Sequence, residues 1–199
     1  VLAYNYFNFD MVEAPHGRAL AVATGIKRAR PDLFVLTYQG DGDLAAIGTA
    51  ETIHAGNRGE QISTVFINNA IYGMTGGQMA PTTLLGMEAT TTPGGRRADL
   101  HGRPIDISRM LAVCEGVVYI ERCGLTSVKQ IRQAKRAIRK CFQVQQDGLG
   151  FALVELLSPC PTNWKMTPVQ AWKWINEVMM QVYPLGVIKD TTGYDEGKK

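Results

Sequence analysis

The stretch LFVLTYQGDGD, residues 33–43, decides the fold because it joins a strand-like segment directly to a glycine turn. Its first half is apolar and rich in residues that favour strands, so we predict a strand over residues 33–38. Residues 44–56 follow with the apolar spacing of a helix. A strand, a tight turn and a helix in immediate succession are the building unit of α/β proteins with parallel sheets.

The same alternation continues along the chain. Further strands are expected over 62–67, 117–121 and 151–157, and further helices over 17–30, 105–115, 126–146 and 167–183. Pro31 ends the first helix, and Thr167 with Pro168 begins the last. The Gly-, Thr- and Pro-rich residues 73–104 are too irregular for one element. We therefore predict a single α/β domain over residues 1–199, with a mostly parallel sheet, helices on both faces and a frayed tail over 190–199.

Composition excludes several classes of protein. The chain has 199 residues, a net charge of +3 and 45% hydrophobic residues, which suits one globular core. Its charge is too balanced for nucleic-acid binding. Apolar runs such as residues 151–157 fall far short of the ~20 residues that cross a bilayer, and no signal peptide opens the sequence, so we expect the cytoplasm. The sequence begins in mid-pattern at Val1, so we expect the natural chain to start further upstream.

Three polar segments follow strand ends, at residues 40–43, 68–78 and 158–164. Ligands of parallel sheets bind beyond the carboxyl ends of the strands, so we expect these segments at one rim. Asp41 offers a carboxylate oxygen and Asn69 an amide oxygen; with a backbone carbonyl and phosphate oxygens they suit Mg²⁺. A helix starting after the glycine turn favours a diphosphate at its N-terminus. The residues alone therefore predict a magnesium–diphosphate site, although Asp-Gly is also a common structural turn.

Longer motifs show a more specific resemblance. GDG followed by the pair Asn68 and Asn69 resembles the signature of thiamine-diphosphate enzymes. The string NNAIYGMTGGQMAPTT, residues 68–83, is similar to the beta subunits of 2-oxoacid:ferredoxin oxidoreductases. PHGRALAVATG at 15–25 and LSPCPT at 157–162 resemble the same family. The motifs stand in family order, so the resemblance covers nearly the whole chain.

This resemblance implies roles for individual residues. Asp41 and Asn69 would bind Mg²⁺ through their side chains, and Ile71 through its carbonyl oxygen. His16, in the PHGR motif, would lie near the thiazolium ring and the substrate, as a hydrogen-bonding or proton-transfer group. The other cofactor-binding positions, which would face the diphosphate, are Gly40, Gly42, Asp43, Asn68, Gly73, Met74 and Thr75.

Cys160 lies in an SPCP loop similar to the one that supplies a thiolate to a 4Fe-4S cluster in many family members. The family's other thiolates come from a C-x-x-C pair and a further N-terminal cysteine, and this sequence has neither. One thiolate cannot hold such a cluster, so the resemblance implies a cluster in the intact subunit and none in this chain by itself. A plain loop cysteine stays open as the alternative. Cys114, Cys123 and Cys141 are expected to be reduced, packed thiols.

The implied reaction is the oxidative decarboxylation of a 2-oxo acid to an acyl-coenzyme A, with electrons passing to ferredoxin. An alpha subunit would supply the glutamate that faces the cofactor's aminopyrimidine, a gamma subunit would complete the assembly, and Glu51 is not that glutamate. 2-Oxoglutarate is the favoured substrate, and 2-oxoisovalerate stays open. Gly76 stands where some relatives carry a basic residue, which counts against a dicarboxylate, and Ala80 stands where a serine is common.

Other interpretations remain open at this point. A non-redox thiamine-diphosphate decarboxylase or acetohydroxyacid-synthase-like enzyme would share GDG and NN but lack the YGMTGGQ and SPCP segments. A non-catalytic α/β subunit that binds another nucleotide would have no affinity for thiamine diphosphate. The basic side chains of residues 126–146 predict a solvated helix face, with a docking surface for an acidic ferredoxin as the alternative. His54 and His101 lack a motif and are interpreted as surface or loop residues.

Overall fold

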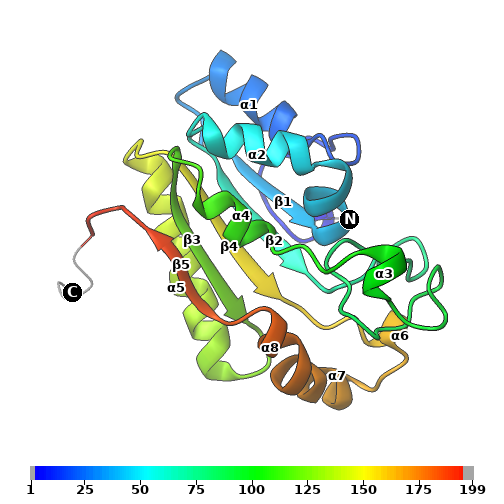
Figure 1. The fold of residues 1–199 in the computed structure, drawn as a ribbon. Coiled ribbons are helices and arrows are strands. Elements are labelled where there is room, and N and C mark those ends of the chain that lie inside the picture. The colour runs from blue at the N-terminus through cyan, green and yellow to red at the C-terminus, as the bar shows by residue number, and fades with distance from the viewer. Residues whose placement is uncertain (1–2, 195–199) are drawn as a thin grey trace.

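The computed structural model describes residues 3–194 and arranges them around one five-stranded sheet (Figure 1). The strands are β1 (Leu36–Gly40), β2 (Ser63–Asn68), β3 (Val117–Gly124), β4 (Phe151–Leu157) and β5 (Gly186–Asp190). Their order is β1-β2-β4-β3-β5; the first four are parallel, and β5 runs antiparallel to β3. The mostly parallel α/β fold that the sequence predicts is therefore confirmed.

Helical segments connect the strands. The α-helices are α1 (Ala19–Ala29), α2 (Thr49–Asn57), α3 (Ala98–His101), α4 (Ile107–Ala112), α5 (Val128–Gln146), α6 (Pro161–Trp164), α7 (Pro168–Trp174) and α8 (Met180–Val182). A 3₁₀ turn, η1 (Ala3–Asn5), and two π-helical turns, η2 (Asp43–Ile47) and η3 (Ile175–Met179), complete the set. The segments α7, η3 and α8 together make up the helix predicted over residues 167–183. It starts at a capping box between Thr167 and Gln170, with Pro168 in its first turn.

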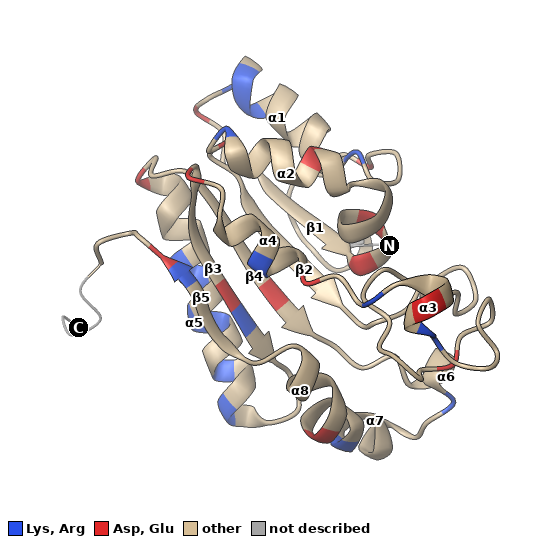
Figure 2. Cartoon of the chain, viewed as in Figure 1, with Lys and Arg blue, Asp and Glu red and all other residues tan. Residues whose placement is uncertain are grey.

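Helices cover both faces of the sheet, as Figure 1 shows. Helix α5 packs against β3, β4 and β2 on one face, while α1, α2 and α4 pack on the other. Helix α5 begins at Ser127, whose side chain accepts a hydrogen bond from the Gln130 N–H. Its buried residues are Ala134, Ala137, Cys141, Val144 and Gln145. The opposite side of α5 carries exposed Lys and Arg residues (Figure 2), as a solvated face requires. The apolar residues Val128 and Ile131 near the start of α5 are exposed as well.

A third group of apolar residues lies at the carboxyl ends of the strands. It joins the turn after β2 to the C-terminal helical segments and consists of Ala70, Ile71, Leu84, Ala89, Leu157, Trp164, Ala171, Ile175, Met179 and Tyr183. The irregular residues 73–104 thus fold over an apolar base of their own. This base gives the loops at the rim a fixed support.

Two strands differ from the prediction. Strand β1 begins at Leu36 rather than Leu33, because its pairing with β2 starts where Leu36 faces Ser63. Leu33 and Phe34 are exposed before it. Strand β5 is absent from the sequence prediction, since an exposed edge strand of five residues has no clear alternation of apolar and polar residues.

The expected frayed tail is bonded as far as the structure describes it. Asp190 faces Tyr119 in the sheet and pairs with Lys140 at 2.5 Å. The Tyr194 hydroxyl donates to Asp147 at 2.5 Å. Residues 195–199 of the expected tail lie outside the described residues.

A buried ionic cluster links β3 and β4 near the rim. Nε of Arg122 lies 2.7 Å from the Glu155 carboxylate and its Nη2 lies 2.5 Å from Asp106. The Ser108 hydroxyl donates to Glu155 at 2.5 Å, and the Asn68 amide donates to it at 2.7 Å. The cluster thereby reaches the end of β2, where the polar rim begins.

Among the described residues, no helix is both long enough and apolar enough to span a membrane.

Candidate cofactor site

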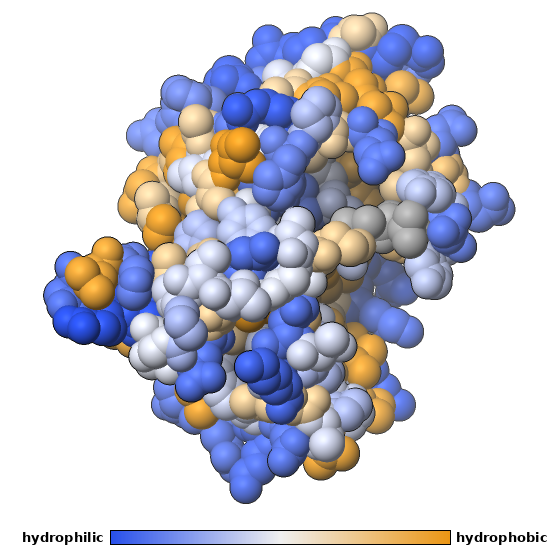
Figure 3. Space-filling model, turned by 90° about the vertical axis from the view of Figure 1, so that its right-hand side faces the viewer, coloured by the Kyte–Doolittle hydropathy of each residue, from blue (hydrophilic) through white to orange (hydrophobic). Residues whose placement is uncertain are grey.

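The three segments predicted at one rim do come together. Gly40 faces Ile67 in the sheet, and Asn68 faces Leu157, so the ends of β1, β2 and β4 are adjacent. Figure 3 views the molecule from the side of α3 and α6, toward which these strand ends point; hydrophilic and hydrophobic residues are mixed there, and the surface is hollowed near its middle. This is the place where parallel sheets bind ligands.

Asp41 presents a buried carboxylate at this rim. The residue is only 3% exposed. Burial raises the pKa of its carboxyl group to about 6, while hydrogen bonds from the Thr82 hydroxyl, at 2.5 Å, and the Gly42 N–H, at 2.9 Å, act in the opposite direction. Neither donor carries a charge, so the carboxylate keeps a net negative charge above pH 6.

Asn69 brings its amide group to the same point. One atom of this amide lies 2.6 Å from the Ile71 carbonyl oxygen and 3.3 Å from Oδ1 of Asp41. With its nitrogen on that side, the amide donates to both oxygens. With its oxygen on that side, three oxygens from Asp41, Asn69 and Ile71 come together and repel one another unless a cation lies between them.

Magnesium fits this set of atoms. One carboxylate, one amide oxygen and one carbonyl oxygen are hard ligands of the kind that Mg²⁺ accepts, with phosphate and water oxygens completing its shell. No group of three or more His, Cys, Asp or Glu side chains that could hold a metal occurs within residues 3–194.

The turn between Asn69 and Ile71 is held in an uncommon backbone conformation. Ala70 has a φ of 57°, which is unusual for a residue with a side chain. Its N–H donates to the Asn68 side chain at 3.1 Å, and its carbonyl accepts from the Thr83 hydroxyl at 2.6 Å. The Asn68 side chain is fully buried between Ala70 and Glu155. The Asn68 side chain therefore lies behind the turn, where it holds Asn69 and Ile71, the two candidate magnesium ligands of this turn, in place.

The predicted diphosphate loop follows immediately. Gly77 donates to the Tyr72 carbonyl at 2.8 Å, which closes a tight loop over residues 72–77. Gly76 and Gly77 have φ angles of 112° and 82°, which favour glycine. Met74 is 67% exposed, and the Thr75 hydroxyl donates to Gln78 at 2.6 Å. This loop leaves backbone groups at the surface next to Asn69, as binding of a diphosphate requires.

Tyr72 makes the glycine at position 42 necessary. A Cβ atom on Gly42 would collide with the Tyr72 ring, whose hydroxyl donates to the Gly42 carbonyl at 3.1 Å. At Gly40, by contrast, a Cβ atom would meet nothing within 4 Å. Gly42 is thus required by packing within the chain, while Gly40 borders open space.

His16 and Asp43 contact each other at the edge of the site. Nδ1 of His16 lies 2.9 Å from the Asp43 carboxylate. The sequence predicts both residues at the cofactor, but not their contact with each other. The Asp43 side chain is therefore engaged with the PHGR turn and is not directed freely at a diphosphate.

Cys160 packs against the diphosphate loop. Its Sγ atom accepts a hydrogen bond from the Asn163 amide at 3.2 Å, and the same amide donates to the Gly73 carbonyl at 2.8 Å. The neighbouring Trp164 donates from its indole nitrogen to the Asn69 carbonyl at 3.1 Å. The segment predicted to carry a cluster ligand thus also supports the magnesium and diphosphate segments directly.

The remaining cysteines lie in the core. Cys114, Cys123 and Cys141 are buried and free of disulfide bonds, as expected. Burial raises the pKa of the Cys123 and Cys141 thiols to about 12. These three thiols are far less available than Cys160, which is partly exposed.

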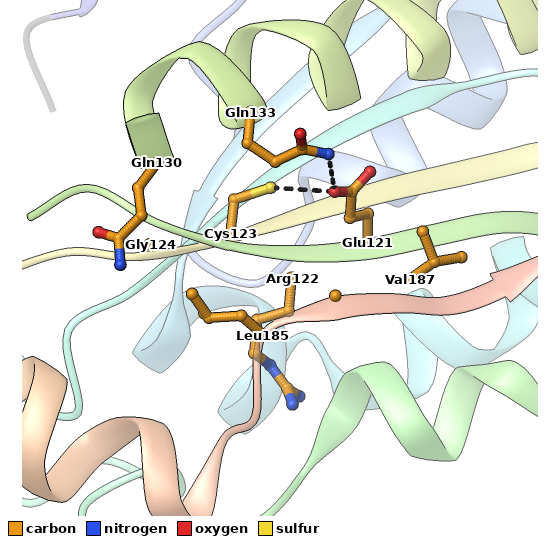
Figure 4. Close-up of a pocket in the computed structure, with 9 residues that line it drawn as sticks. Glu121, Arg122, Cys123, Gly124, Gln130, Gln133, Leu185 and Val187 are labelled. Carbon is orange, nitrogen blue, oxygen red and sulfur yellow. Dashed lines mark hydrogen bonds between the residues drawn. The ribbon is translucent and has the colours of Figure 1, made fainter. Parts of the chain in front are cut away.

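A depression of about 350 Å³ lies away from the rim site, between β3, the first turns of α5 and the start of β5. In Figure 4 its carboxylate, Glu121, points toward Gln133 and Cys123. Gln133 donates to Glu121 at 2.5 Å, Cys123 contacts it at 3.7 Å, and the Tyr119 hydroxyl also donates to it. Because internal donors already satisfy this carboxylate, the rim is the better candidate for cofactor chemistry.

Several residues that support the proposed ligand residues have no role assigned from the sequence. They are Thr82, Tyr72, Asn163 and Trp164, which stand in loops or in the four-residue helix α6. Glu51, which the sequence analysis excludes as the glutamate facing the aminopyrimidine, lies on α2 and pairs with Arg18 at 2.5 Å.

The comparisons with known proteins agree with this geometry. Residues 3–156 match the family model described as thiamine pyrophosphate enzyme, C-terminal TPP binding domain. The chain is 48% identical to the ketoisovalerate oxidoreductase subunit VorA of Methanothermobacter marburgensis, over 98% of this chain and 41% of that protein. It is 42% identical to the 2-oxoglutarate synthase subunit KorB of Archaeoglobus fulgidus, over 86% of this chain and 60% of that protein.

A solved structure is similar as well. The 2-oxoglutarate:ferredoxin oxidoreductase from Magnetococcus marinus, with 2-oxoglutarate, coenzyme A and succinyl-CoA bound, matches with a TM-score of 0.66 and 26% identity, over 90% of this chain and 64% of that chain. The chain thus spans only part of the length of each of these relatives. Fold, rim geometry and sequence similarity together place it in one group: the chain belongs to the thiamine pyrophosphate enzyme family, as a TPP-binding domain similar to subunits of 2-oxoacid oxidoreductases.

Proposed function

We propose that this chain is the thiamine-diphosphate- and Mg²⁺-binding part of a 2-oxoacid:ferredoxin oxidoreductase. The complete enzyme would oxidise a 2-oxo acid to CO₂ and an acyl-coenzyme A and pass the electrons to ferredoxin. One observation carries the proposal: the Asp41 carboxylate, the Asn69 side-chain amide and the Ile71 carbonyl oxygen gather beside a glycine-rich loop at the carboxyl ends of parallel strands. Such a set suits a cation that binds a diphosphate.

In this proposal each segment has a separate task. Asp41, Asn69 and Ile71 hold Mg²⁺, and the backbone of residues 73–75 faces the diphosphate, with Gly42 across the rim. When bound, thiamine diphosphate supplies a carbon nucleophile and a place for the electrons released with CO₂. His16 presents its imidazole to the rim and holds or moves a proton there.

The active site needs residues from other subunits. Glu51 is paired with Arg18, and Glu121 and Glu155 are buried in internal networks. None of these three carboxylates is directed at the rim, so we propose that an alpha subunit supplies the glutamate for the aminopyrimidine. A gamma subunit, coenzyme A and ferredoxin complete the assembly. Cys160 would contribute one thiolate to a 4Fe-4S cluster in the intact subunit.

Two substrates are separated by charge. 2-Oxoglutarate, favoured in the sequence analysis, has a second carboxylate, whereas 2-oxoisovalerate has a branched apolar chain. Residues 69–79 contain no Lys or Arg, and Gly76 has no side chain that could pair with a second carboxylate. The relative with 48% identity is named for ketoisovalerate. We therefore propose 2-oxoisovalerate as the better substrate, and the ratio of kcat/KM for the two acids in the reconstituted enzyme decides between them.

Titration of thiamine diphosphate with and without Mg²⁺ tests the proposal. Asp41→Ala removes the charged ligand, so Mg²⁺-dependent binding should be lost. Asp32→Ala is the matched control, because Asp32 pairs with Arg30 on the surface and its loss should leave binding unchanged. Equal affinities of the Asp41→Ala variant and the wild type would contradict the metal assignment.

A further inference from the structure

We propose that Asp43 positions His16: its carboxylate holds the imidazole with the proton on Nδ1, so that Nε2 is left as an unprotonated acceptor. The group on which His16 acts rests on the proposed function, but the assignment of the proton does not. The inference gives the second acid of the GDGD motif a task for its side chain. In the sequence analysis that residue had only a place near the diphosphate.

Two hydrogen-bond donors and the His16 ring surround the Asp43 carboxylate. Oδ1 accepts from the Gly17 N–H at 2.5 Å and lies 2.9 Å from Nδ1 of His16. Oδ2 accepts from the Gln39 side-chain amide at 2.5 Å. Gln39 is only 3% exposed, so it holds the carboxylate from inside the fold. The carboxylate is thus fixed from three sides, and His16 is one of them.

The backbone of the PHGR turn is clamped to η2. Gly17 has a φ of 78°, and a Cβ atom there would collide with Ile47 and lie 2.8 Å from the Gly48 nitrogen. A Cβ atom on Gly48 would lie 2.6 Å from the Asp43 carbonyl oxygen. Arg18 donates to the Ile47 carbonyl at 3.1 Å. Close glycine packing therefore brings His16 to Asp43 and allows little relative movement.

Chemistry then decides the position of the proton. An ionised carboxylate can only accept hydrogen bonds, and an Nδ1 lone pair 2.9 Å from it would be repelled, so this contact favours a proton on Nδ1. Nε2 of a neutral ring consequently has a free lone pair. The His16 side chain is 55% exposed, and its ring centroid lies 6.2 Å from that of Tyr72, whose hydroxyl bonds to Gly42. The ring therefore lies beside the GDG turn with one edge accessible.

This arrangement allows a reversible proton transfer. A proton accepted at Nε2 from a hydroxyl or water at the rim gives an imidazolium, whose positive charge the Asp43 carboxylate offsets. The same proton leaves Nε2 when the ring acts as an acid, so nothing is consumed. A carboxylate behind a histidine acts in this way by holding the ring orientation and tautomer.

A second histidine, His101, serves as an internal reference for the tautomer of His16. His101 has the opposite pattern, since its Nδ1 accepts the Arg97 N–H at 2.9 Å. Its proton, in the neutral ring, must therefore be on Nε2. With only three histidines in the sequence, two of them are assigned opposite tautomers.

Nitrogen-15 NMR of the full chain, labelled at histidine, distinguishes the two tautomers near pH 8. We expect His16 with the proton on Nδ1 and His101 with the proton on Nε2. Asp43→Ala removes the carboxylate, so the preference for Nδ1 should be lost and the population of His16 with its proton on Nε2 should rise, with His101 unchanged. A wild-type His16 with its proton on Nε2 overturns the proposal, whether or not the variant folds.

A second measurement uses the reconstituted complex. Asp43→Asn should lower kcat by about 100-fold or more, the range for loss of acid–base catalysis, with affinity for thiamine diphosphate and Mg²⁺ almost unchanged. His101→Gln should change neither quantity. If Asp43→Asn keeps the wild-type kcat, Asp43 does not position His16 for the reaction. If the wild-type complex fails to bind thiamine diphosphate, the proposed function fails, and the NMR result still decides the inference.

Discussion

Two regions of the same sheet bury negative charge in different ways. In the cluster between β3 and β4, Glu155 is 1% exposed and is neutralised by Arg122, which is also 1% exposed. At the rim, Asp41 is 3% exposed and receives hydrogen bonds from uncharged groups such as the Thr82 hydroxyl and the Gly42 backbone. No Lys, Arg or His pairs with Asp41 within the described residues 3–194.

This difference indicates separate roles for the two buried carboxylates, Glu155 and Asp41. A buried carboxylate with an internal cation is complete, so it can serve the fold. A buried carboxylate without one raises the free energy of the folded chain unless a cation binds to it. The Glu155 region is therefore structural in character, and the Asp41 region has the electrostatics of a metal site.

The largest effect on stability is expected for the ionic cluster between β3 and β4. Arg122→Met leaves Glu155 without its cation and Asp106 with only Arg109, at 3.5 Å. It also removes the contact of the guanidinium with the Tyr183 ring, 5.2 Å from its centroid. Breaking a buried pair by removing one partner costs about 3–5 kcal/mol. Urea unfolding should show a loss of that size.

Arg30→Ala is the matched control, because the pair of Arg30 with Asp32 is exposed. It should leave the unfolding midpoint unchanged. Equal midpoints for Arg122→Met and Arg30→Ala would show that the buried cluster does not support the fold.

Removing the buried charge at the rim should change the stability of the fold in the opposite direction. Asp41→Asn removes a charge that burial disfavours, so the metal-free variant should be more stable than the wild type at pH 7, by about 2 kcal/mol. The Thr82 hydroxyl can rotate to accept from the new amide, so no buried donor is left unpaired. Mg²⁺-dependent cofactor binding should be lost at the same time.

The pH dependence of the free energy of unfolding tests the direction of this stability change independently. The pKa of Asp41 is about 6 in the folded chain, against an ordinary value of 3.8. Between these values the folded state keeps a proton that the unfolded state releases, so the wild type should lose stability as pH rises from about 4 to about 6. Asp41→Asn should lack this part of the curve. Two superimposable stability curves, measured by denaturant unfolding without metal, would show that the charge of Asp41 is compensated after all.

A smaller effect is expected from the support of the rim. Trp164→Phe keeps an aromatic ring near Trp174, whose ring centroid is 4.6 Å away, but removes the indole N–H that donates to the Asn69 carbonyl. Loss of one such hydrogen bond is worth about 1 kcal/mol, so affinity for Mg²⁺ and thiamine diphosphate should fall about fivefold. Trp172→Phe, at an exposed position of α7, is the control. A variant with unchanged affinity would separate Trp164 from the metal site.

The sequence predicts the proposed ligand residues better than the residues that support them. Asp41 and Asn69 follow two strands, and the parallel sheet brings strand ends to one edge, so the pattern alone predicts their proximity, whereas the role of Ile71 comes from the family resemblance. Thr82 and Trp164 reach the same place through irregular chain, whose path depends on tertiary packing and not on periodicity. Their importance therefore becomes visible only in three dimensions.

The same limit applies to the fold and to the GDGD motif. Four strands and their connecting helices follow from apolar periodicity, but β5 is held to the sheet edge by pairing with β3 and by contacts such as that of Asp190 with Lys140. The motif places Asp43 at the rim without showing where its side chain points. That direction depends on Gly17, 26 residues earlier in the chain.

The smallest effect concerns the cysteine thiols. Here the rim and the core are compared by the reactivity of their thiols and not by stability. Cys160 is partly exposed, whereas burial raises the pKa of Cys123 and Cys141 to about 12. Thiolate is the reactive form, so a disulfide reagent at pH 8 should label Cys160 in the folded chain and reach the other two only after unfolding. Mass spectrometry of the labelled peptides measures this, and Cys160→Ser should abolish the fast phase while leaving the unfolding midpoint within error. Rapid labelling of Cys141 in the native chain would mean that α5 opens from the sheet, and the core face beneath it would then be less rigid than the rim.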